Sequence, residues 1–356
     1  APFFCRLTKD VDWVKHPANA GPLWFNYPFS QELLQKSMDQ EIRYAYNAGI
    51  DFFIYHGPAA KVSDPHSWHL KHNLDAHVGS KIPEAKKMRF VWALYSHPAL
   101  KYTRGKVALM MDEVIEYIKM PNWQKVMDDR PLVMVLWPEN FNEMLEAATG
   151  KERMGGTEFV EYIRTRVRTA GLKDPYVVGM ANSSGHTKAA SYRTWGYDAF
   201  MDYDGSYGGN VAERDQGPTY PEATAGIVDA LEKHWSPTGF PYIPPFSSMQ
   251  YCFPRSIDKD GKPVTRRYHY QWPNKGDMAA RIKVALDYVA AHPKECEAQV
   301  FSMYSWNEFS EGGGLCPTMG NPPEYRPVTK WLDEVAGALK EWEYPQEPNK
   351  ELKATR

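Results

Sequence analysis

The chain has 356 residues, 43% of them hydrophobic and 14% aromatic, which is enough to bury one large core or two ordinary ones. Its 42 basic and 44 acidic residues give a formal net charge of −2, so the charge balance indicates neither a nucleic-acid partner nor an anionic membrane surface. The sequence has no apolar run of about 18 residues, and no membrane span is predicted.

The cysteines lie far apart, with no metal-ligand or Cys-x-x-Cys spacing, so they do not indicate a redox compartment. They are Cys5, Cys252, Cys296 and Cys316. The chain begins with Ala1 rather than Met and shows no signal peptide, as a processed chain would. We therefore expect a periplasmic, cell-envelope or extracellular protein.

Short apolar runs alternate with amphipathic stretches along the chain, which is the pattern of parallel βα units. Thr157 is predicted to cap one helix with Glu158 in its first turn, and Gly49 and Gly171 are predicted to end helices. The predicted strands span residues 2–7, 50–55, 89–95, 131–137, 176–180, 198–203, 242–249 and 299–306. The predicted helices span residues 33–47, 107–118, 157–170, 186–194, 221–234, 277–290 and 328–342, and a loop with a further helix leads to Met88.

Eight strand–helix repeats predict a (β/α)8 TIM barrel, a single domain over residues 1–342 with enlarged loops on its carboxyl face. The longest loop, 252–276, contains a hairpin around Asp260-Gly261 and is predicted to be a lid, a subsite wall or a solvated hairpin. Residues 343–356 form a polar C-terminal tail. A doubly wound open sheet is the alternative, but no strand is followed by a Gly-x-Gly-x-x-Gly or Gly-Lys-Ser/Thr loop.

Residues just past each predicted strand are the candidates for the functional site, because such barrels carry it at the carboxyl ends of the strands. Aromatic, carboxylate and amide side chains gather there. Carboxylates and amides bond hydroxyl groups while Trp and Tyr cover ring faces, so the set predicts an oligosaccharide or polysaccharide. The predicted ligand-contacting residues are Tyr55, His56, Tyr95, His97, Trp137, Glu139, Asn182, Asp202, Tyr203, Asp204, Gln250, Trp306 and Asn307.

Several of these positions have an equally simple structural explanation. His56 and His97 could be ordinary buried histidines, and Glu139 could be an acid at a helix start. Asp202 and Asp204 point the same way on a strand, so one of them could only brace the barrel rim.

No metal or other cofactor is predicted. The repeat His66-x-x-His69-x-x-His72 has histidines at regular spacing, but it lies in a polar loop and no carboxylate completes a ligand set.

The last predicted strand leads into Asn307-Glu308 and, three residues later, Glu311, followed by three glycines. Two neighbouring carboxylates resist ionising together, so one can stay protonated while the other does not. Such a pair suits acid/base chemistry. The alternative is an exposed acidic loop.

The stretch Trp306-Asn307-Glu308-Phe309-Ser310-Glu311-Gly312 resembles the Asn-Glu-x-x-Glu-Gly motif of glycoside hydrolase family 99. This family contains endo-α-mannosidases and endo-α-mannanases, and the resemblance extends to its WbsX-like bacterial relatives. Asn47-Ala48-Gly49-Ile50-Asp51 and Asp129-Arg130-Pro131-Leu132-Val133 are similar as well. Strand one, ending in Arg6-Leu7, departs from the family because it has no aromatic run.

The resemblance implies a metal-free retaining glycosidase with a (β/α)8 barrel. Glu308 would act as the base on the sugar 2-hydroxyl, which attacks C1, and Glu311 as the general acid and then the base for water. The substrate would be a 1,2-trans glycoside such as an α-mannoside or α-rhamnoside.

Two alternatives stay open at this point. Within the same class, Glu139 could be the acid and Glu308 a nucleophile, with the two carboxyl groups about 5 Å apart. In a different class, the barrel could bind carbohydrate without catalysis or serve envelope-polysaccharide assembly. The sequence makes no prediction of the sugar, the cutting mode or the oligomeric state.

Overall fold

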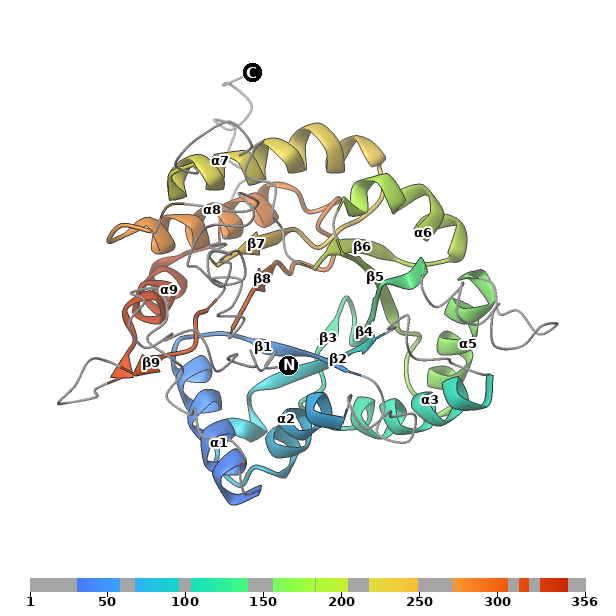
Figure 1. Cartoon of the computed structure of the whole chain (residues 1–356). Helices are drawn as coiled ribbons and strands as arrows, with labels where there is room; N and C mark the ends of the chain where they lie inside the picture. The colour runs from blue at the N-terminus through green and yellow to red at the C-terminus, as the bar shows by residue number, and fades with distance from the viewer. Residues whose placement is uncertain are drawn as a thin grey trace, which may run out of the picture.

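The computed structural model describes residues 31–57, 68–95, 104–139, 156–182, 184–203, 218–248, 271, 273–306, 314–319 and 327–344. Within these ranges, parallel strands surround a common centre and helices form an outer layer (Figure 1). The fold is therefore the predicted (β/α)8 TIM barrel.

The parallel strands of the barrel are β1 (Phe52–Gly57), β2 (Arg89–Tyr95), β4 (Arg130–Leu136), β5 (Tyr176–Ala181), β6 (Ala199–Asp202), β7 (Pro245–Ser247) and β8 (Ser302–Tyr304). The first five pair in the order β1-β2-β4-β5-β6, and β7 pairs with β8. A parallel bridge between Phe200 and Tyr242 connects the two groups. Within the described ranges β1 and β8 do not pair, and a cavity of about 580 Å³ lies between them. The strand predicted at residues 2–7 lies outside the described part of the chain.

The helices of the outer layer are α1 (Gln31–Asn47), α2 (Trp68–Gly79), α3 (Arg104–Ile118), α5 (Gly156–Thr169), α6 (Ala189–Trp195), α7 (Tyr220–Ala230), α8 (Asp277–Ala291) and α9 (Lys330–Glu341). Short helical turns add η4 (Glu84–Lys86), η5 (Gly185–Lys188), η7 (Leu231–Trp235) and η8 (Ser236–Thr238). Gly49 has φ of +82°, the left-handed conformation that ends a helix. At α7, Thr219 and Glu222 form a capping box that satisfies two otherwise unpaired backbone N–H groups.

The structure corrects several element predictions. Helix α5 begins at Gly156, so Thr157 is not its N-cap and instead donates to the carbonyl oxygen of Thr194. His69 and His72 belong to helix α2 and not to a loop. Strands β7 and β8 are shorter than predicted.

Three short strands were not predicted. Strand β3 (Lys125–Val126) forms an antiparallel hairpin with β4, and β9 (Thr318–Met319) pairs with β10 (Pro327–Val328).

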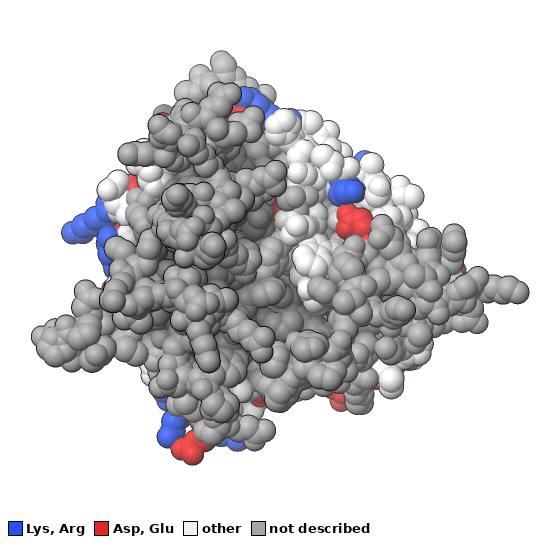
Figure 2. Space-filling view, viewed as in Figure 1, with Lys and Arg blue, Asp and Glu red and all other residues white. Residues whose placement is uncertain are grey.

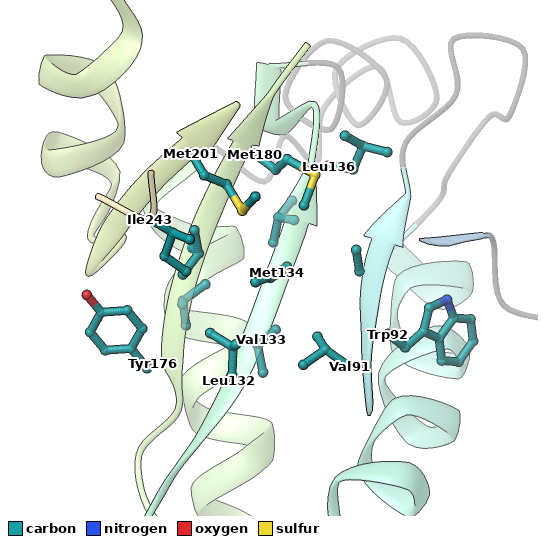
Figure 3. Packing of buried hydrophobic residues seen from close by; sticks show 14 of the residues in the cluster. Val91, Trp92, Leu132, Val133, Met134, Leu136, Tyr176, Met180, Met201 and Ile243 are labelled. Carbon is teal, nitrogen blue, oxygen red and sulfur yellow. The ribbon is translucent and has the colours of Figure 1, made fainter. Parts of the chain in front are cut away.

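The core lies between the strands and the helices and also fills the barrel. Every residue from Leu132 to Leu136 in β4 is buried, as expected for a parallel strand covered on both faces (Figure 3). Trp92 of β2 packs edge-to-face on Tyr117 of α3, with ring centroids 5.5 Å apart. The buried aromatic and branched side chains fix the strands and thereby the positions of their carboxyl ends.

An ion-pair network lies at the opposite, amino end of the strands. Asp198 accepts hydrogen bonds from Arg130 at 2.8 Å and from Arg164 at 2.7 Å. Arg164 also pairs with Asp174 at 2.5 Å. The network joins the start of β4 and helix α5 to the loops that lead into β5 and β6, so it stabilises the base of the barrel.

In the described part of the chain, no helix has the length and apolarity needed to cross a membrane. On the face shown in Figure 2, the described Lys and Arg side chains are scattered around the outline, several beside acidic ones. Among the described side chains of this face, no extended patch of one sign is visible.

Candidate active site

Four aromatic side chains lie at the carboxyl ends of the barrel strands. The rings of Tyr95 and Trp137 are 5.3 Å apart, and those of Tyr203 and Tyr304 are 4.8 Å apart. We call these four residues the aromatic mouth. Its two pairs come from four different strands, and flat aromatic faces of this kind can cover sugar rings.

Strand register indicates that Tyr95 and Tyr203 of the aromatic mouth point into the barrel. Met180 pairs with Met201 across β5 and β6, and both side chains line the same cavity as Tyr203 and Tyr304. Tyr95 pairs with Leu136 of β4, and Leu136 pairs with Met180, so Tyr95 belongs to the same row of paired residues. Paired residues of neighbouring strands point to the same side, so Tyr95 faces the interior as well. Burial raises the pKa of Tyr95 to about 12, which keeps its hydroxyl protonated at neutral pH.

Trp137 has a backbone conformation that bulky residues rarely adopt. Its φ is +56°, and its backbone N–H donates to the carbonyl oxygen of Met180 at 2.8 Å. Ser184, after β5, has φ of +58°. Left-handed residues other than glycine concentrate at functional sites, where the surrounding structure holds them in place. Both lie at strand ends on the carboxyl side of the barrel.

Glu139, two residues after Trp137, is held by a neutral donor. Its Oε1 accepts a hydrogen bond of 2.7 Å from the hydroxyl of Tyr192 on α6. Burial, and then the charge of Glu139, raise the pKa of Tyr192, and the same two causes raise that of Tyr197. The Tyr192 ring lies against Gly179 of β5, where an added Cβ would approach it to 2.9 Å. The Glu139 carboxylate therefore has one oxygen engaged at the rim of the barrel.

Asp202 braces the rim. Its side chain is fully buried, and Oδ1 accepts a hydrogen bond of 2.6 Å from the backbone N–H of Gly185 in η5. Asp202 follows Met201 in β6, so it points to the opposite side of the sheet, away from the barrel interior. A Cβ at Gly185 would lie 2.3 Å from the same carboxylate oxygen. Asp202 thus takes the bracing role that the sequence left open for one of the two aspartates.

Tyr55 lies in the layer between β1 and the helices and does not join the aromatic mouth. Its hydroxyl is 2.9 Å from Nδ1 of His77 on α2, and it also contacts Met38 on α1. Burial lowers the pKa of His77 to about 4, so the ring is neutral at physiological pH. Tyr55 therefore contributes to packing rather than to the interior surface.

Ser248 joins the ends of β7 and β8. Its backbone N–H donates to the carbonyl oxygen of Tyr304 at 2.5 Å, and its hydroxyl accepts from the Ser305 N–H at 3.0 Å. Buried Arg281 donates to the carbonyl oxygen of Ser247 at 2.5 Å and lies over the ring of Tyr220. These contacts fix the point where β8 ends, three residues before Asn307 of the Asn-Glu-x-x-Glu motif.

Trp306 points toward α1. Its indole N–H donates to Glu41 Oε2 at 2.8 Å, and its ring lies 5.2 Å from that of Phe53. Asn182, at the end of β5, is exposed. No pattern in the sequence points to Glu41, Tyr192 or Ser248. Glu41 and Tyr192 lie on helices, far along the chain from the strand ends that they contact.

Other predicted residues lie outside the described part of the chain, and their roles stay predictions. They are His97, Asp204, Gln250, Asn307, Glu308 and Glu311, together with His66 and most of the 252–276 segment. The backbone of His56 pairs with Ala93, but its side chain is not described. Among the described residues, no group of three or more His, Cys, Asp or Glu side chains could hold a metal ion.

No protein-family model matches the sequence, and no similar sequence is found among curated proteins. The structure is similar to that of a family 99 endo-α-mannosidase from Bacteroides thetaiotaomicron in complex with bis-tris-propane. The TM-score is 0.50 and the identity 16%, with 92% of this chain and 90% of the other covered.

A second structure of the endo-α-mannosidase has a TM-score of 0.47 and 17% identity, over 88% of this chain and 80% of the other. An α-amylase from Geobacillus thermoleovorans in complex with acarbose has a TM-score of 0.39 and 14% identity, over 86% of this chain and 71% of the other. Of these three similarities, the first supports the assignment of the barrel fold.

Proposed function

We propose that this barrel is a retaining glycoside hydrolase that cleaves 1,2-trans glycosides, α-mannosides among them, in a polysaccharide or glycan. The observation that carries the proposal is the order of the chain: the Asn-Glu-x-x-Glu motif begins three residues after the last residue of β8, Tyr304, which belongs to the aromatic mouth. Aromatic faces would hold sugar rings while two glutamates move protons. The likeness of the fold to an endo-α-mannosidase supports the same reading.

The proposed mechanism uses Glu308 as a base and Glu311 as a general acid. Glu308 removes the proton of the 2-hydroxyl, O2 attacks C1 to form a 1,2-anhydro sugar, and the bond from C1 to the leaving oxygen breaks. Glu311 gives its proton to that leaving oxygen. Glu311 then takes a proton from water, which attacks C1, and Glu308 returns a proton to O2 as the three-membered ring opens. Two inversions at C1 give net retention.

This route restricts the substrate, because O2 can attack C1 only from the face opposite the leaving group. A 1,2-trans arrangement satisfies this requirement. Glu139 already accepts the Tyr192 hydroxyl at 2.7 Å. We therefore assign Glu139, like the remaining groups of the site, to binding and orienting the sugar. The alternative in which Glu139 is the acid and Glu308 a nucleophile predicts a covalent glycosyl adduct on Glu308.

The test compares Glu308→Gln and Glu311→Gln with a matched control, Glu297→Gln. Glu297 accepts the hydroxyl of Tyr176 at 3.0 Å near the amino end of β5, away from the strand exits. Release of reducing ends from α-mannan and rhamnan should fall by about 10²-fold or more in each of the first two variants, because each loses a proton-transfer group. The control should keep its activity.

Near-wild-type hydrolysis by either motif variant would contradict the proposal. Oligosaccharide binding in calorimetry without release of reducing ends by the wild type would instead favour a non-catalytic carbohydrate-binding or envelope-polysaccharide assembly protein. We also propose a periplasmic, cell-envelope or extracellular location, where such polymers occur, and cell fractionation tests it.

A further inference from the structure

Segment 307–313 carries the motif glutamates. We call the residues that flank it, Ser305 and Trp306 on one side and Leu315 and Cys316 on the other, the base of the segment. The backbone N–H of Cys316 donates to the carbonyl oxygen of Trp306 at 2.7 Å, and that of Leu315 donates to the carbonyl oxygen of Ser305 at 3.2 Å. These hydrogen bonds connect the residues on either side of 307–313. A group that fixes Trp306 therefore fixes both ends of that segment.

The Trp306 side chain is held by α1 and β1. Its indole N–H donates to Oε2 of Glu41 at 2.8 Å, and its ring packs edge-to-face on Phe53 with centroids 5.2 Å apart. Glu41 precedes Trp306 by 265 residues, and its neighbours in α1, Met38 and Ile42, are buried. The indole therefore has a polar anchor on a helix that the core holds in place.

The surroundings of Glu41 are mainly apolar. Burial raises its pKa to about 7, and the hydrogen bond from Trp306 acts in the opposite direction. Burial raises the pKa of the Tyr55 hydroxyl and of the Cys316 thiol, and the Glu41 charge raises both further. Because the donor is a neutral indole, a glutamine amide oxygen at position 41 can accept the same hydrogen bond.

We propose that Glu41 is a positioning residue: by holding the Trp306 indole, it fixes the base of segment 307–313 and thereby the placement of Glu308 and Glu311. This inference rests on the proposed function. In this role Glu41 acts through Trp306 and not on the sugar, so its loss should affect the chemical step more than binding. A displacement of about 1 Å at reacting groups can lower the rate by about 10²-fold.

The experiment compares Glu41→Leu, which removes the acceptor, with Glu41→Gln, which keeps it. The matched control is Asp287→Asn, because Asp287 accepts the indole N–H of Trp342 at 2.8 Å, the same kind of bond between the α8 and α9 regions. Three quantities are measured: amide hydrogen exchange of residues 305–316, the dissociation constant of an α-mannan oligosaccharide by calorimetry, and kcat from the release of reducing ends.

Glu41→Leu should raise the exchange rates by about 10-fold and lower kcat by about 10- to 100-fold, while the dissociation constant stays within about 3-fold. Glu41→Gln at pH 6 should restore all three quantities to within about 3-fold of wild type. Asp287→Asn should leave the exchange rates of residues 305–316 and kcat unchanged.

Unchanged exchange in Glu41→Leu would overturn the inference, whatever the activity. Glu41→Gln behaving like Glu41→Leu would also overturn it, because the acceptor would then not be the group that matters. If the wild type releases no reducing ends, the proposed function fails, and hydrogen exchange alone decides whether Glu41 anchors Trp306.

Discussion

Replacing Asp198 by Asn should destabilise the barrel without changing its site. Asp198 accepts hydrogen bonds from Arg130 at 2.8 Å, from Arg164 at 2.7 Å and from the backbone N–H of Val177 at 2.7 Å. The exposed fraction of the side chain is 18% for Asp198 and 13% for Arg164, so solvent only partly screens the pair. Asparagine keeps the shape but removes the charge that compensates two guanidinium groups.

The expected loss follows from this partial burial. Removing one partner of a buried ion pair costs about 3–5 kcal/mol, whereas an exposed pair contributes about 0–1 kcal/mol. Arg164 also keeps its contact with Asp174 at 2.5 Å. We therefore expect the free energy of unfolding to fall by about 2 kcal/mol. For a chain of this length, that loss lowers the melting temperature by about 3 °C.

The measurement is urea unfolding followed by circular dichroism, with Asp51→Asn as the matched control. Asp51 pairs with Arg89 at 2.6 Å, but the two side chains are 74% and 42% exposed. The control should lose less than about 0.5 kcal/mol. Equal losses in the two variants would refute the reasoning. So would lower activity of folded Asp198→Asn, because the amino end of a barrel serves stability.

Three further predictions concern the carboxyl side of the barrel. Gly185→Ala should lower the free energy of unfolding in urea by about 2 kcal/mol, because its Cβ would lie 2.3 Å from Asp202 Oδ1; an unchanged midpoint would contradict the bracing role. Tyr192→Phe removes the donor to Glu139, so kcat should fall by about 3- to 10-fold and the free energy of unfolding by about 1 kcal/mol, measured by reducing-end release and urea unfolding. The pKa of Glu41 is raised to about 7 in the folded protein, so its contribution to stability is complete below its ordinary pKa of 4.5 and is lost as pH rises through 7. The free energy of unfolding of Glu41→Gln, relative to that of wild type, should therefore rise by about 2 kcal/mol between pH 4 and pH 8, after allowance for the partial exposure of Glu41. Equal pH profiles of the two proteins in urea unfolding would contradict this.

The parallel strands were predictable where they are buried on both faces. Strands β2, β4 and β5 lie within one residue of their predicted bounds, because a continuous apolar run leaves few other interpretations. Strand β7 was predicted too long, and it begins only at Pro245, because Pro244 before it lacks the N–H that a ladder needs. The β3–β4 hairpin was missed because its turn residues Met127, Asp128 and Asp129 have positive φ without a glycine to indicate it.

The candidate site was predictable as a set of strand ends but not as a set of facing side chains. Tyr95 contacts Trp137 and Tyr203 contacts Tyr304, whereas Tyr55 faces the helices. The ligand-binding role of these residues stays a prediction. A strand that is apolar on both faces gives no alternation from which its inward side can be read. Glu41 was not predictable for a different reason, since its partner Trp306 lies 265 residues away and no local pattern connects them.

Carboxylates at the two ends of the barrel are held in chemically different ways. At the amino end Asp198 is bound by two guanidinium groups, whereas Glu139 and Glu41 accept from the neutral donors of Tyr192 and Trp306. An amide oxygen can replace a carboxylate for a neutral donor, but it cannot compensate a buried cation. Asp198→Asn should therefore lower stability, whereas Glu139→Gln beside β4 and, at pH 6, Glu41→Gln beside β8 should leave it nearly intact. There, any loss of activity can be assigned to the chemistry of the carboxylate itself.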